Sequence, residues 1–425
     1  MSFVTKIRCA RCGEEYSLAD KLCMCPKKDC GRLDIYYDYQ AIAEKVNKKL
    51  LSQRAQKLWK YFEFLPVESK KNIVTLEVGA TPLLKANNLA KKLDLRNLYL
   101  KDETRSPTGS FKDRSMTVGV SKAVEFGVKA TATASSGNAA AALAAHSAKA
   151  GLKCYAFVLE SAPEVKLAQI RLYGTMVMRV KAMEKGKDPT VQMLLAVVEK
   201  YGWYPCPSFG SFNPYQVEGP KTITYEIVEQ LGWQLPDWVM VPTGSGCLLT
   251  GIWKGFKDFR NLGFIESASK LAAIQPEGCA PLVRAFKQNK GPFEIEPWGC
   301  VNTIASGLTD VFPWDGDASL VALRETGGTA ETVSDKEILE GQKLLASTEG
   351  IFAEPTGVAS LAGLVKLAKE GKIKKDEIVV VLVTGSGLKD PKAVMSRFRK
   401  TPTIKPDLKE FEAVAKLEQA KTKLK

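Results

Sequence analysis

Residues 130–150 read ATATASSGNAAAALAAHSAKA, and this stretch decides the fold that we expect. It has a short strand pattern, four small residues and then an alanine-rich helical pattern. Strand-like apolar runs recur elsewhere in the chain, and helical patterns such as 221–231 and 358–369 separate them. These runs lie at 33–37, 98–100, 154–159, 176–180, 238–241, 271–274 and 378–383. Apolar strands that alternate with helices predict parallel sheets covered by helices on both faces.

The expected fold class is therefore α/β, with two doubly wound parallel-sheet domains and an N-terminal zinc-ribbon-like extension. We expect the extension at 1–38, a main region at 39–395 with a smaller subdomain at about 110–215, and a helical tail at 396–425. Four apolar residues of the tail fall at helical spacing on one stripe. They are Leu408, Phe411, Val414 and Leu417.

Composition and charge argue against several classes of protein. The chain has 425 residues, of which 45% are hydrophobic and 25% charged, as in ordinary globular proteins. No apolar run approaches the roughly 18 residues of a membrane span, and the first residues lack the apolar core of a secretory signal. The net charge is +14, but the lysines are scattered among acidic residues. We therefore expect a cytoplasmic protein with a basic surface, without a membrane or nucleic-acid partner.

Five of the ten cysteines lie within the first 30 residues. Cys9 and Cys12 form a CxxC knuckle, and further cysteines follow at positions 23, 25 and 30. Tetrahedral Zn²⁺ takes four thiolates from two tight turns, so we predict a structural zinc site with Cys23 left over. Its ligands are Cys9, Cys12, Cys25 and Cys30. Free thiols without metal are the alternative, and a ribbon by itself also permits a nucleic-acid-binding module.

The segment Ser106–Arg114, SPTGSFKDR, contains the residue most suited to covalent chemistry. Its Pro and Gly favour a turn, and Ser110 can cap a following helix. Lys112 then falls in the first helical turn, where a helix N-terminus and partial burial favour a reactive amine. Such a lysine can form a Schiff base with a carbonyl cofactor, and Phe111 can pack beside a planar ring. A lysine in a plain surface helix is the alternative when the segment is taken alone.

Three loops follow strand patterns and are rich in small polar residues and glycine: 135–138 (SSGN), 243–248 (TGSGCL) and 384–390 (TGSGLKD). Bare backbone N–H groups at a strand end and helix start bind anions, and the second loop suits one phosphate monoester better than a dinucleotide. Plain connecting turns are the alternative for each loop. Because parallel strands end at one edge of the sheet, the three loops and Lys112 are expected to share one crevice.

The same motifs, in this order, resemble those of the fold-type II pyridoxal-phosphate enzymes, and they are most similar to the threonine synthases. The resemblance rests on SPTGSFKDR (106–114), SSGN (135–138), NPYQVEGPKT (213–222), TGSG (243–246), EPTG (354–357) and TGSGLKD (384–390). It implies a tryptophan synthase β-like fold, pyridoxal 5'-phosphate as cofactor and a homodimer. The implied reaction converts O-phospho-L-homoserine and water to L-threonine and phosphate.

The resemblance also implies residue roles. Lys112 would be the Schiff-base lysine and the proton shuttle, and Asn138 would bind the ring hydroxyl of the cofactor. Phe111 would lie beside the pyridine ring, and Thr384 would meet its nitrogen. The phosphate-binding residues would be Gly244, Ser245, Gly246, Cys247 and Leu248. The substrate-binding residues would be Thr108, Ser135, Ser136 and Gln216.

This chain departs from the family pattern at Gln216, where the family usually has an arginine that helps to bind the substrate phosphate. A glutamine is a much weaker phosphate ligand than a bidentate cation. The candidates to compensate are Lys101, Arg105, Arg114 and Lys221. The departure leaves open a serine/threonine dehydratase or a cysteate-synthase-like enzyme, besides the non-enzymatic zinc-ribbon protein. We expect no catalytic role for His146, the lone histidine.

Overall fold

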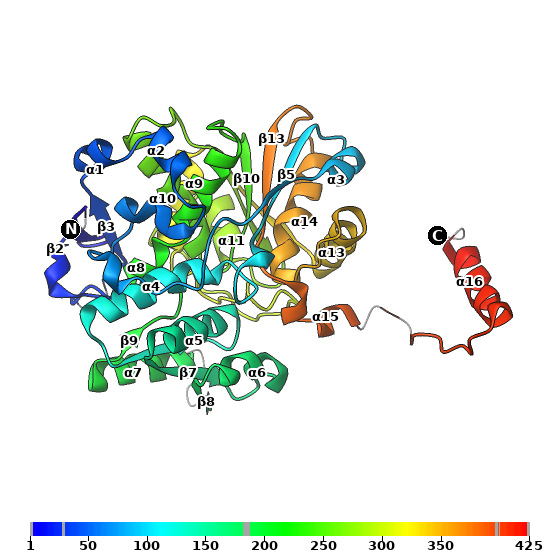
Figure 1. The fold of residues 1–425 in the computed structure, drawn as a ribbon, viewed down its shortest axis with the longest axis horizontal. Helices are drawn as coiled ribbons and strands as arrows, with labels where there is room; N and C mark the ends of the chain where they lie inside the picture. Colours follow the sequence, from blue (N-terminus) through cyan, green and yellow to red (C-terminus); the bar gives the residue numbers. More distant parts are fainter. Residues whose placement is uncertain (1–2, 28–29, 182–187, 396–397, 399, 423–425) are drawn as a thin grey trace.

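The computed structural model describes residues 3–27, 30–181, 188–395, 398 and 400–422, with side chains up to residue 416 in the last segment. Its strands form three sheets, of six, four and three strands. Figure 1 shows the two larger sheets and their helices in one body, with the N-terminal sheet against its side. The expected α/β architecture with a ribbon-like extension is confirmed, whereas the exact domain boundaries stay a prediction.

The six-stranded sheet forms the centre of the larger part. Its order is β12 (Thr329–Val333), β11 (Lys270–Pro276), β10 (Trp238–Pro242), β13 (Ile378–Val383), β5 (Asn97–Asp102) and β4 (Leu83–Lys85). All neighbouring strands are parallel except the edge strand β4, which runs antiparallel to β5. The strand β10 is buried along its whole length, which explains its continuous apolar sequence.

The four-stranded sheet is entirely parallel, in the order β8 (Met176–Val180), β7 (Lys153–Leu159), β6 (Ala130–Ala134) and β9 (Tyr204–Pro205). It lies in the lower part of Figure 1. The helices packed on it include α5 (Asn138–Ala150), α6 (Glu164–Leu172) and α7 (Pro189–Tyr201). The alanine-rich face of α5 lets this helix pack closely against α4 (Lys112–Phe126), which begins at the predicted Schiff-base lysine.

The N-terminal sheet is antiparallel, in the order β2 (Glu15–Tyr16), β1 (Val4–Cys9) and β3 (Leu33–Tyr37). Its buried residues, such as Ile7 and Ile35, belong to the same apolar core as buried residues of the six-stranded sheet and its helices. Arg32 adds an ion pair of 2.6 Å to Asp317 of α12 (Gly316–Glu325). The ribbon-like unit is therefore packed on the body rather than tethered to it.

The remaining helices lie between the strands in the sequence or near the two ends of the chain. They are α1 (Tyr39–Lys45), α2 (Lys48–Gln53), α3 (Asn87–Lys92), α8 (Pro214–Val217), α9 (Lys221–Gln230), α10 (Cys247–Asn261), α11 (Pro281–Lys287), α13 (Asp335–Glu349), α14 (Pro355–Lys369), α15 (Lys392–Met395) and α16 (Leu408–Thr422). In the described part of the chain, no helix is long and apolar enough to cross a lipid bilayer.

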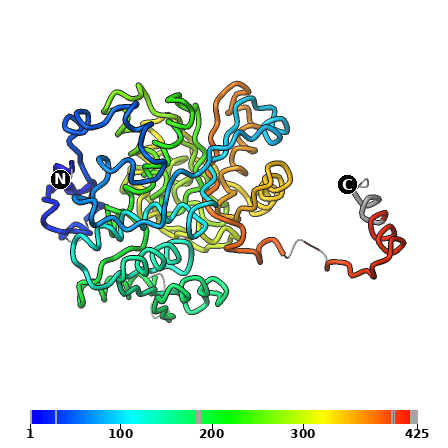
Figure 2. Tube along the Cα trace, viewed as in Figure 1, coloured from blue at the N-terminus to red at the C-terminus, as the bar shows by residue number. Residues whose placement is uncertain are grey.

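The tail helix α16 forms where the sequence predicts a helix, and it lies apart from the body in Figures 1 and 2. Leu408 and Phe411, from the predicted apolar stripe, are exposed, and Val414 is half-buried. The side chain of Leu417, the fourth residue of that stripe, lies outside the described residues.

Candidate active site

The turn that carries the lysine is fastened to the loop after the central strand β13. The N–H of Phe111 donates to the carbonyl of Thr384 at 3.0 Å, and Ser110 pairs with Gly385 in an isolated bridge. Asp113, fully buried, accepts both the N–H and the hydroxyl of Thr108. These long-range bonds place the first turn of α4 at the carboxyl edge of the six-stranded sheet.

Arg114, two residues after Lys112, anchors the start of α4 to neighbouring parts of the chain. Its guanidinium is fully buried and donates to both carboxylate oxygens of Glu103 and of Glu226, at 2.7 to 2.8 Å. Thr81 and Thr222 accept its remaining hydrogen bonds. A buried ion network thus ties the helix that presents the lysine to α9 and to the turn that follows β5.

A cavity of about 730 Å³ opens between the two larger sheets, beside Lys112. All three predicted loops line it, together with a loop at 306–310 and the start of α14. The predicted residues that line it are Thr108, Phe111, Lys112, Ser135, Ser136, Asn138, Gly244, Ser245, Gly246, Cys247, Leu248 and Thr384. Tertiary structure therefore gathers the lysine and the loops into one hollow, while their individual roles stay predictions.

The amine of Lys112 reaches the cavity with few polar partners. Its Nζ donates to Ser208 Oγ at 2.5 Å and lies 3.4 Å from Cys247 Sγ. The ring of Phe111 lies beside it, with its centroid 4.7 Å from Nζ. The amine is thus placed within a few ångströms of Cys247, the first residue of α10 and a member of the expected phosphate loop.

The loop before α10 has the geometry of a phosphate cradle. Gly246 has φ +97°, and a Cβ there would lie 2.4 Å from Ser319 Oγ. A Cβ on Gly244 would lie 2.5 Å from a carboxylate oxygen of Asp310. Only glycine fits at either place, and the first amides of α10 have no partner within the helix. An amine beside such a loop fits pyridoxal phosphate, because the aldehyde needs an amine and the phosphate needs bare N–H groups.

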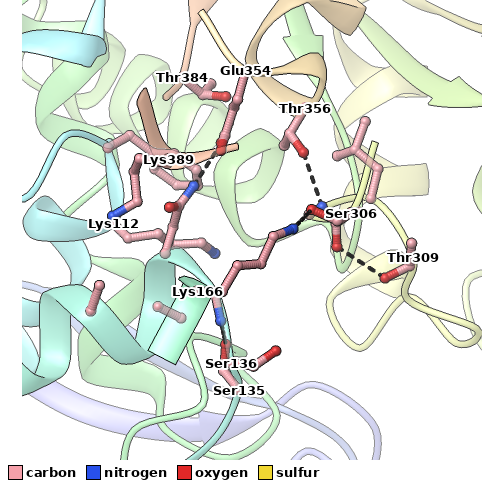
Figure 3. A pocket seen from close by; sticks show the side chains of 18 of the residues that line it. Lys112, Ser135, Ser136, Lys166, Ser306, Thr309, Glu354, Thr356, Thr384 and Lys389 are labelled. Carbon is pink, nitrogen blue, oxygen red and sulfur yellow. Dashed lines mark hydrogen bonds between the residues drawn. The ribbon is translucent and has the colours of Figure 1, made fainter. Parts of the chain in front are cut away.

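Glu354 is a cavity residue whose role the sequence patterns did not reveal. Its carboxylate accepts a hydrogen bond from Asn138 Nδ2 at 2.6 Å, and it enters the cavity on the same side as Thr384 (Figure 3). Burial raises the pKa of Glu354 to about 7, although the Asn138 amide opposes the shift. The contact fixes the side chain that we expect at the ring hydroxyl of the cofactor. The EPTG motif pointed to the family but not to this contact, because the partner Asn138 lies 216 positions away in the sequence.

Replacing Glu354 by glutamine should flatten the pH dependence of stability in the apoenzyme. The folded chain holds the proton of Glu354 more tightly than the unfolded chain, because its pKa is raised from 4.5 to about 7. The free energy of unfolding that this group contributes therefore falls as the pH rises through that window. Urea unfolding across the window should show the variant gaining stability over the wild type toward pH 7. Glu44→Gln, at an exposed site, should show no such gain, and parallel curves for Glu354→Gln and the wild type would contradict the assignment.

Gln216 lies behind the cavity wall rather than in it. It is 1% exposed, it is absent from the described cavity lining, and its Oε1 accepts the N–H of Ser208 at 3.0 Å. Its side chain thus contacts the loop behind the cavity, and the predicted contact with substrate stays a prediction. The reason is tertiary: α8 turns this side chain toward the loop that follows β9.

The four cations expected to compensate for the missing arginine do not line the cavity. Lys101, Arg114 and Lys221 are fully buried in ion pairs with Glu226, Glu103 and Glu218, and Arg105 is exposed and paired with Asp102. None of them therefore stands where it could bind a ligand in the cavity. Buried ion pairs engage three of these side chains, whereas Arg105 lies exposed beside Asp102, outside the described cavity lining.

Two other lysines line the cavity besides Lys112, among the described residues. Lys166 of α6 donates to Ser306 Oγ at 2.8 Å and pairs with Asp390 at 2.9 Å (Figure 3). Lys389, from the loop after β13, donates to Gln169 at 2.7 Å. Burial lowers the pKa of Lys389, although Glu354 and Asp113 oppose the shift. The cavity therefore contains two further cationic side chains, but they are not at position 216, where the family usually has an arginine.

In the loop 135–138, Ser135 and Ser136 line the cavity on the side away from Thr384 and Glu354 (Figure 3). Ser135 Oγ accepts the N–H of Gly137 at 3.2 Å, whereas the hydroxyl of Thr108 is already bonded to Asp113. His146, in α5 beyond this loop, is fully buried. Burial lowers its pKa to about 4, so it is a neutral core residue at physiological pH.

The cysteine cluster lies in the N-terminal sheet, away from the cavity lining. The sulfur atoms of Cys9, Cys12, Cys25 and Cys30 all lie within 4.8 Å of one another. Tetrahedral zinc with thiolate bonds of about 2.3 Å needs sulfur atoms slightly less than 4 Å apart. The donor set and its spacing fit a closed four-thiolate metal site, and residues 28 and 29 within it lie outside the described part.

Comparisons with known proteins decide which family this site belongs to. A family model described as pyridoxal-phosphate dependent enzyme matches residues 74–385, which include Lys112, the first two loops and the start of the third. The chain belongs to the pyridoxal-phosphate-dependent enzyme family. The expectation from the motifs is thereby confirmed, and pyridoxal phosphate is the cofactor of this protein.

Two archaeal relatives of this pyridoxal-phosphate enzyme match it over nearly their whole length. The threonine synthase of Methanocaldococcus jannaschii is 42% identical over 411 residues, which are 96% of this chain and 99% of the relative. The threonine synthase of Methanosarcina acetivorans is 42% identical over 392 residues, or 92% and 93% of the two chains.

Solved structures show the same fold at lower identity. Maize serine racemase has a TM-score of 0.63 at 23% identity and covers 75% of this chain and 91% of its own. Threonine deaminase isoform 2 from Solanum lycopersicum has a TM-score of 0.63 at 22% identity and covers 80% and 92%. These likenesses establish the fold-type II architecture of this pyridoxal-phosphate enzyme and leave its substrate to other evidence.

Proposed function

We propose that this protein is a threonine synthase that converts O-phospho-L-homoserine and water to L-threonine and phosphate. The observation that carries the proposal is the match to threonine synthases along 84–96% of the chain, at 38–42% identity. The cavity supports it, because one amine, one phosphate cradle and two further lysines surround a hollow large enough for cofactor and amino acid. Family membership decides against the non-enzymatic zinc-ribbon alternative.

The protein's own residues perform the steps around the cofactor. Pyridoxal phosphate, when bound, withdraws electrons from the substrate and so makes the protons on its Cα and Cβ acidic. Lys112 would hold the cofactor by its aldehyde and, once released, carry protons to and from the substrate carbons. Asn138, fixed by Glu354, would orient the ring hydroxyl, and the amides of 245–248 would hold the phosphate.

The substrate brings a carboxylate and a phosphate into the cavity. Ser135 and Ser136 present hydroxyls at the start of α5, where a helix N-terminus favours a carboxylate. Lys166 and Lys389 would bind the substrate phosphate in place of the family arginine. Overall, the C–O bond at Cγ breaks and phosphate leaves, one C–H bond at Cβ breaks, water gives its hydroxyl to Cβ, Cγ gains a proton, and the other proton of water ends on the released phosphate.

The decisive experiment is a substrate panel with the cofactor-loaded protein. We expect phosphate and L-threonine to be released in equal amounts from O-phospho-L-homoserine. Ammonia release from L-threonine or L-serine should be at least about a hundredfold slower, because the general acid–base groups of this site serve the elimination of phosphate and not the release of ammonia. Faster ammonia release would favour the dehydratase, the alternative that Gln216 supports. The panel is repeated with sulfite or another nucleophile added. If a product that carries the added nucleophile then replaces threonine, a cysteate-synthase-like enzyme is favoured.

We also propose that the ribbon holds one structural zinc ion per chain, in line with the sulfur spacing. Replacing Cys12 by serine should remove the metal and lower the melting temperature by at least about 5 °C, because metal binding stabilises only the folded ribbon. Metal content measured by mass spectrometry and a thermal scan check this. Cys300→Ser, at an exposed cysteine outside the cluster, is the matched control. Full stability of Cys12→Ser without bound zinc would contradict the proposal.

The homodimer and the cytoplasmic location stay predictions.

A further inference from the structure

Ser208 has a backbone conformation that serine rarely adopts. It lies in the loop between β9 and α8, is 1% exposed and has φ +72°. Seven non-glycine residues in the described part have positive φ, and Ser208 is the buried one among them. Glycine adopts this conformation without steric cost, so a buried serine here indicates that its side chain is needed.

The side chain of Ser208 meets the reactive amine from behind the cavity. Ser208 is absent from the described cavity lining, but its Oγ accepts a hydrogen bond from Lys112 Nζ at 2.5 Å. Cys247 Sγ lies 3.8 Å from Ser208 Oγ and 3.4 Å from Lys112 Nζ, and a thiol is a weak hydrogen-bonding group. The hydroxyl is therefore the strong polar contact of this amine.

Gln216 holds the loop in this conformation. Its Oε1 accepts the N–H of Ser208, whereas its Nε2 is buried without a hydrogen-bond partner among the described residues. Leaving half of a buried amide unpaired is unfavourable, so the side chain is retained for the bond that its oxygen makes. An arginine at this position has no acceptor and cannot make the same bond.

We propose that Ser208 is a positioning residue for Lys112, and that Gln216 keeps Ser208 in place. A hydroxyl accepts a hydrogen bond from a protonated amine and donates one to a neutral amine, so it holds Nζ in both states. Lys112 must be held in both states if it alternately captures the cofactor aldehyde and moves protons. The inference rests on the proposed role of Lys112, and it explains why the family arginine is a glutamine in this chain.

The test measures how fast the apoenzyme captures pyridoxal phosphate, which does not depend on the identity of the substrate. In Ser208→Gly the hydroxyl is lost while the backbone strain is relieved. We expect the visible absorbance of the lysine-bound cofactor to form at least about tenfold more slowly, because Nζ is no longer oriented, while the unfolding midpoint stays equal or rises. With O-phospho-L-homoserine, kcat should fall and KM should change little, because Ser208 does not line the cavity.

Two further variants separate positioning from loop stability. Asn289→Gly relieves positive φ at an exposed turn and should leave capture and turnover unchanged. Gln216→Met removes the acceptor for Ser208 and should slow capture in the same direction as Ser208→Gly. Capture by Ser208→Gly within twofold of the wild type would overturn the inference, as would a slowing matched by a lower unfolding midpoint. If the wild type captures the cofactor but releases no phosphate from O-phospho-L-homoserine, the proposed reaction fails while the capture rates still decide the role of Ser208.

Discussion

Lys112→Ala should lower phosphate release from O-phospho-L-homoserine by at least about a thousandfold, because it removes both the cofactor-binding amine and the group that moves protons. The structure offers no second amine in the same position. Lys166 is engaged by Ser306 and Asp390, and Lys389 by Gln169 and the carbonyl of Thr108. The purified variant should also lack the visible absorbance that borohydride bleaches in the wild type.

The control for this variant is Lys91→Ala, at an exposed lysine of α3. It should keep wild-type activity and colour, so a general effect of removing a lysine is excluded. Mass spectrometry after borohydride reduction should find the pyridoxyl adduct on the peptide that contains Lys112. An adduct on another lysine, with activity retained in Lys112→Ala, would refute the assignment.

Arg114→Met should lower the free energy of unfolding of the apoenzyme by about 3–5 kcal/mol, because it leaves buried Glu103 without a cation and leaves Glu226 with Lys101 alone. Glu103 and Glu226 are 1% and 3% exposed, and the guanidinium between them is fully buried. Urea unfolding followed by tryptophan fluorescence measures the loss. Since Arg114 anchors the first turn of α4, cofactor capture by Lys112 should weaken as well.

Arg105 provides a matched control on the same segment. Its side chain is 63% exposed, so solvent screens its charge, and its buried partner Asp102 keeps the hydrogen bonds from the N–H and the hydroxyl of Thr104 when Arg105 is replaced. Arg105→Met should therefore be nearly neutral. Adding Glu103→Gln to Arg114→Met should recover part of the lost stability, because one unpaired buried charge is then neutralised. A double variant that is less stable than Arg114→Met would show that lost packing, rather than the unpaired charge, causes the effect.

Much of the fold and the cavity was predictable because its signals are local. The strands at 130–134, 176–180 and 378–383 form as their apolar patterns predict. A glycine-rich turn between a buried strand and a helix has the same geometry wherever it occurs, so the phosphate loop was recognisable from its sequence. Five strands were not predicted: β1, β2, β4, β9 and β12. Three of them (β2, β4 and β9) have only two or three residues, and β1 and β12 mix polar with apolar residues, so that none shows a continuous apolar run.

The contacts that tune the site were not predictable in the same way. Glu354 meets Asn138 across 216 positions, and Ser208 meets Lys112 across 96. Nothing in the local pattern marks such partners. Gln216 illustrates the limit most clearly, because its motif points to substrate whereas its side chain turns to the backbone of Ser208.

By itself, the sequence determined the α/β class, the place of Lys112 at a helix start, the glycine loops and the cysteine set, since each depends on residues close together in the chain. Only the tertiary structure decided which cations face the cavity, which carboxylate holds Asn138 and which hydroxyl meets Lys112. The physical reason is that burial and hydrogen bonding depend on which side chains packing brings together. A lysine or an arginine becomes a ligand for an anion only where packing leaves its charge unpaired and turned toward the hollow.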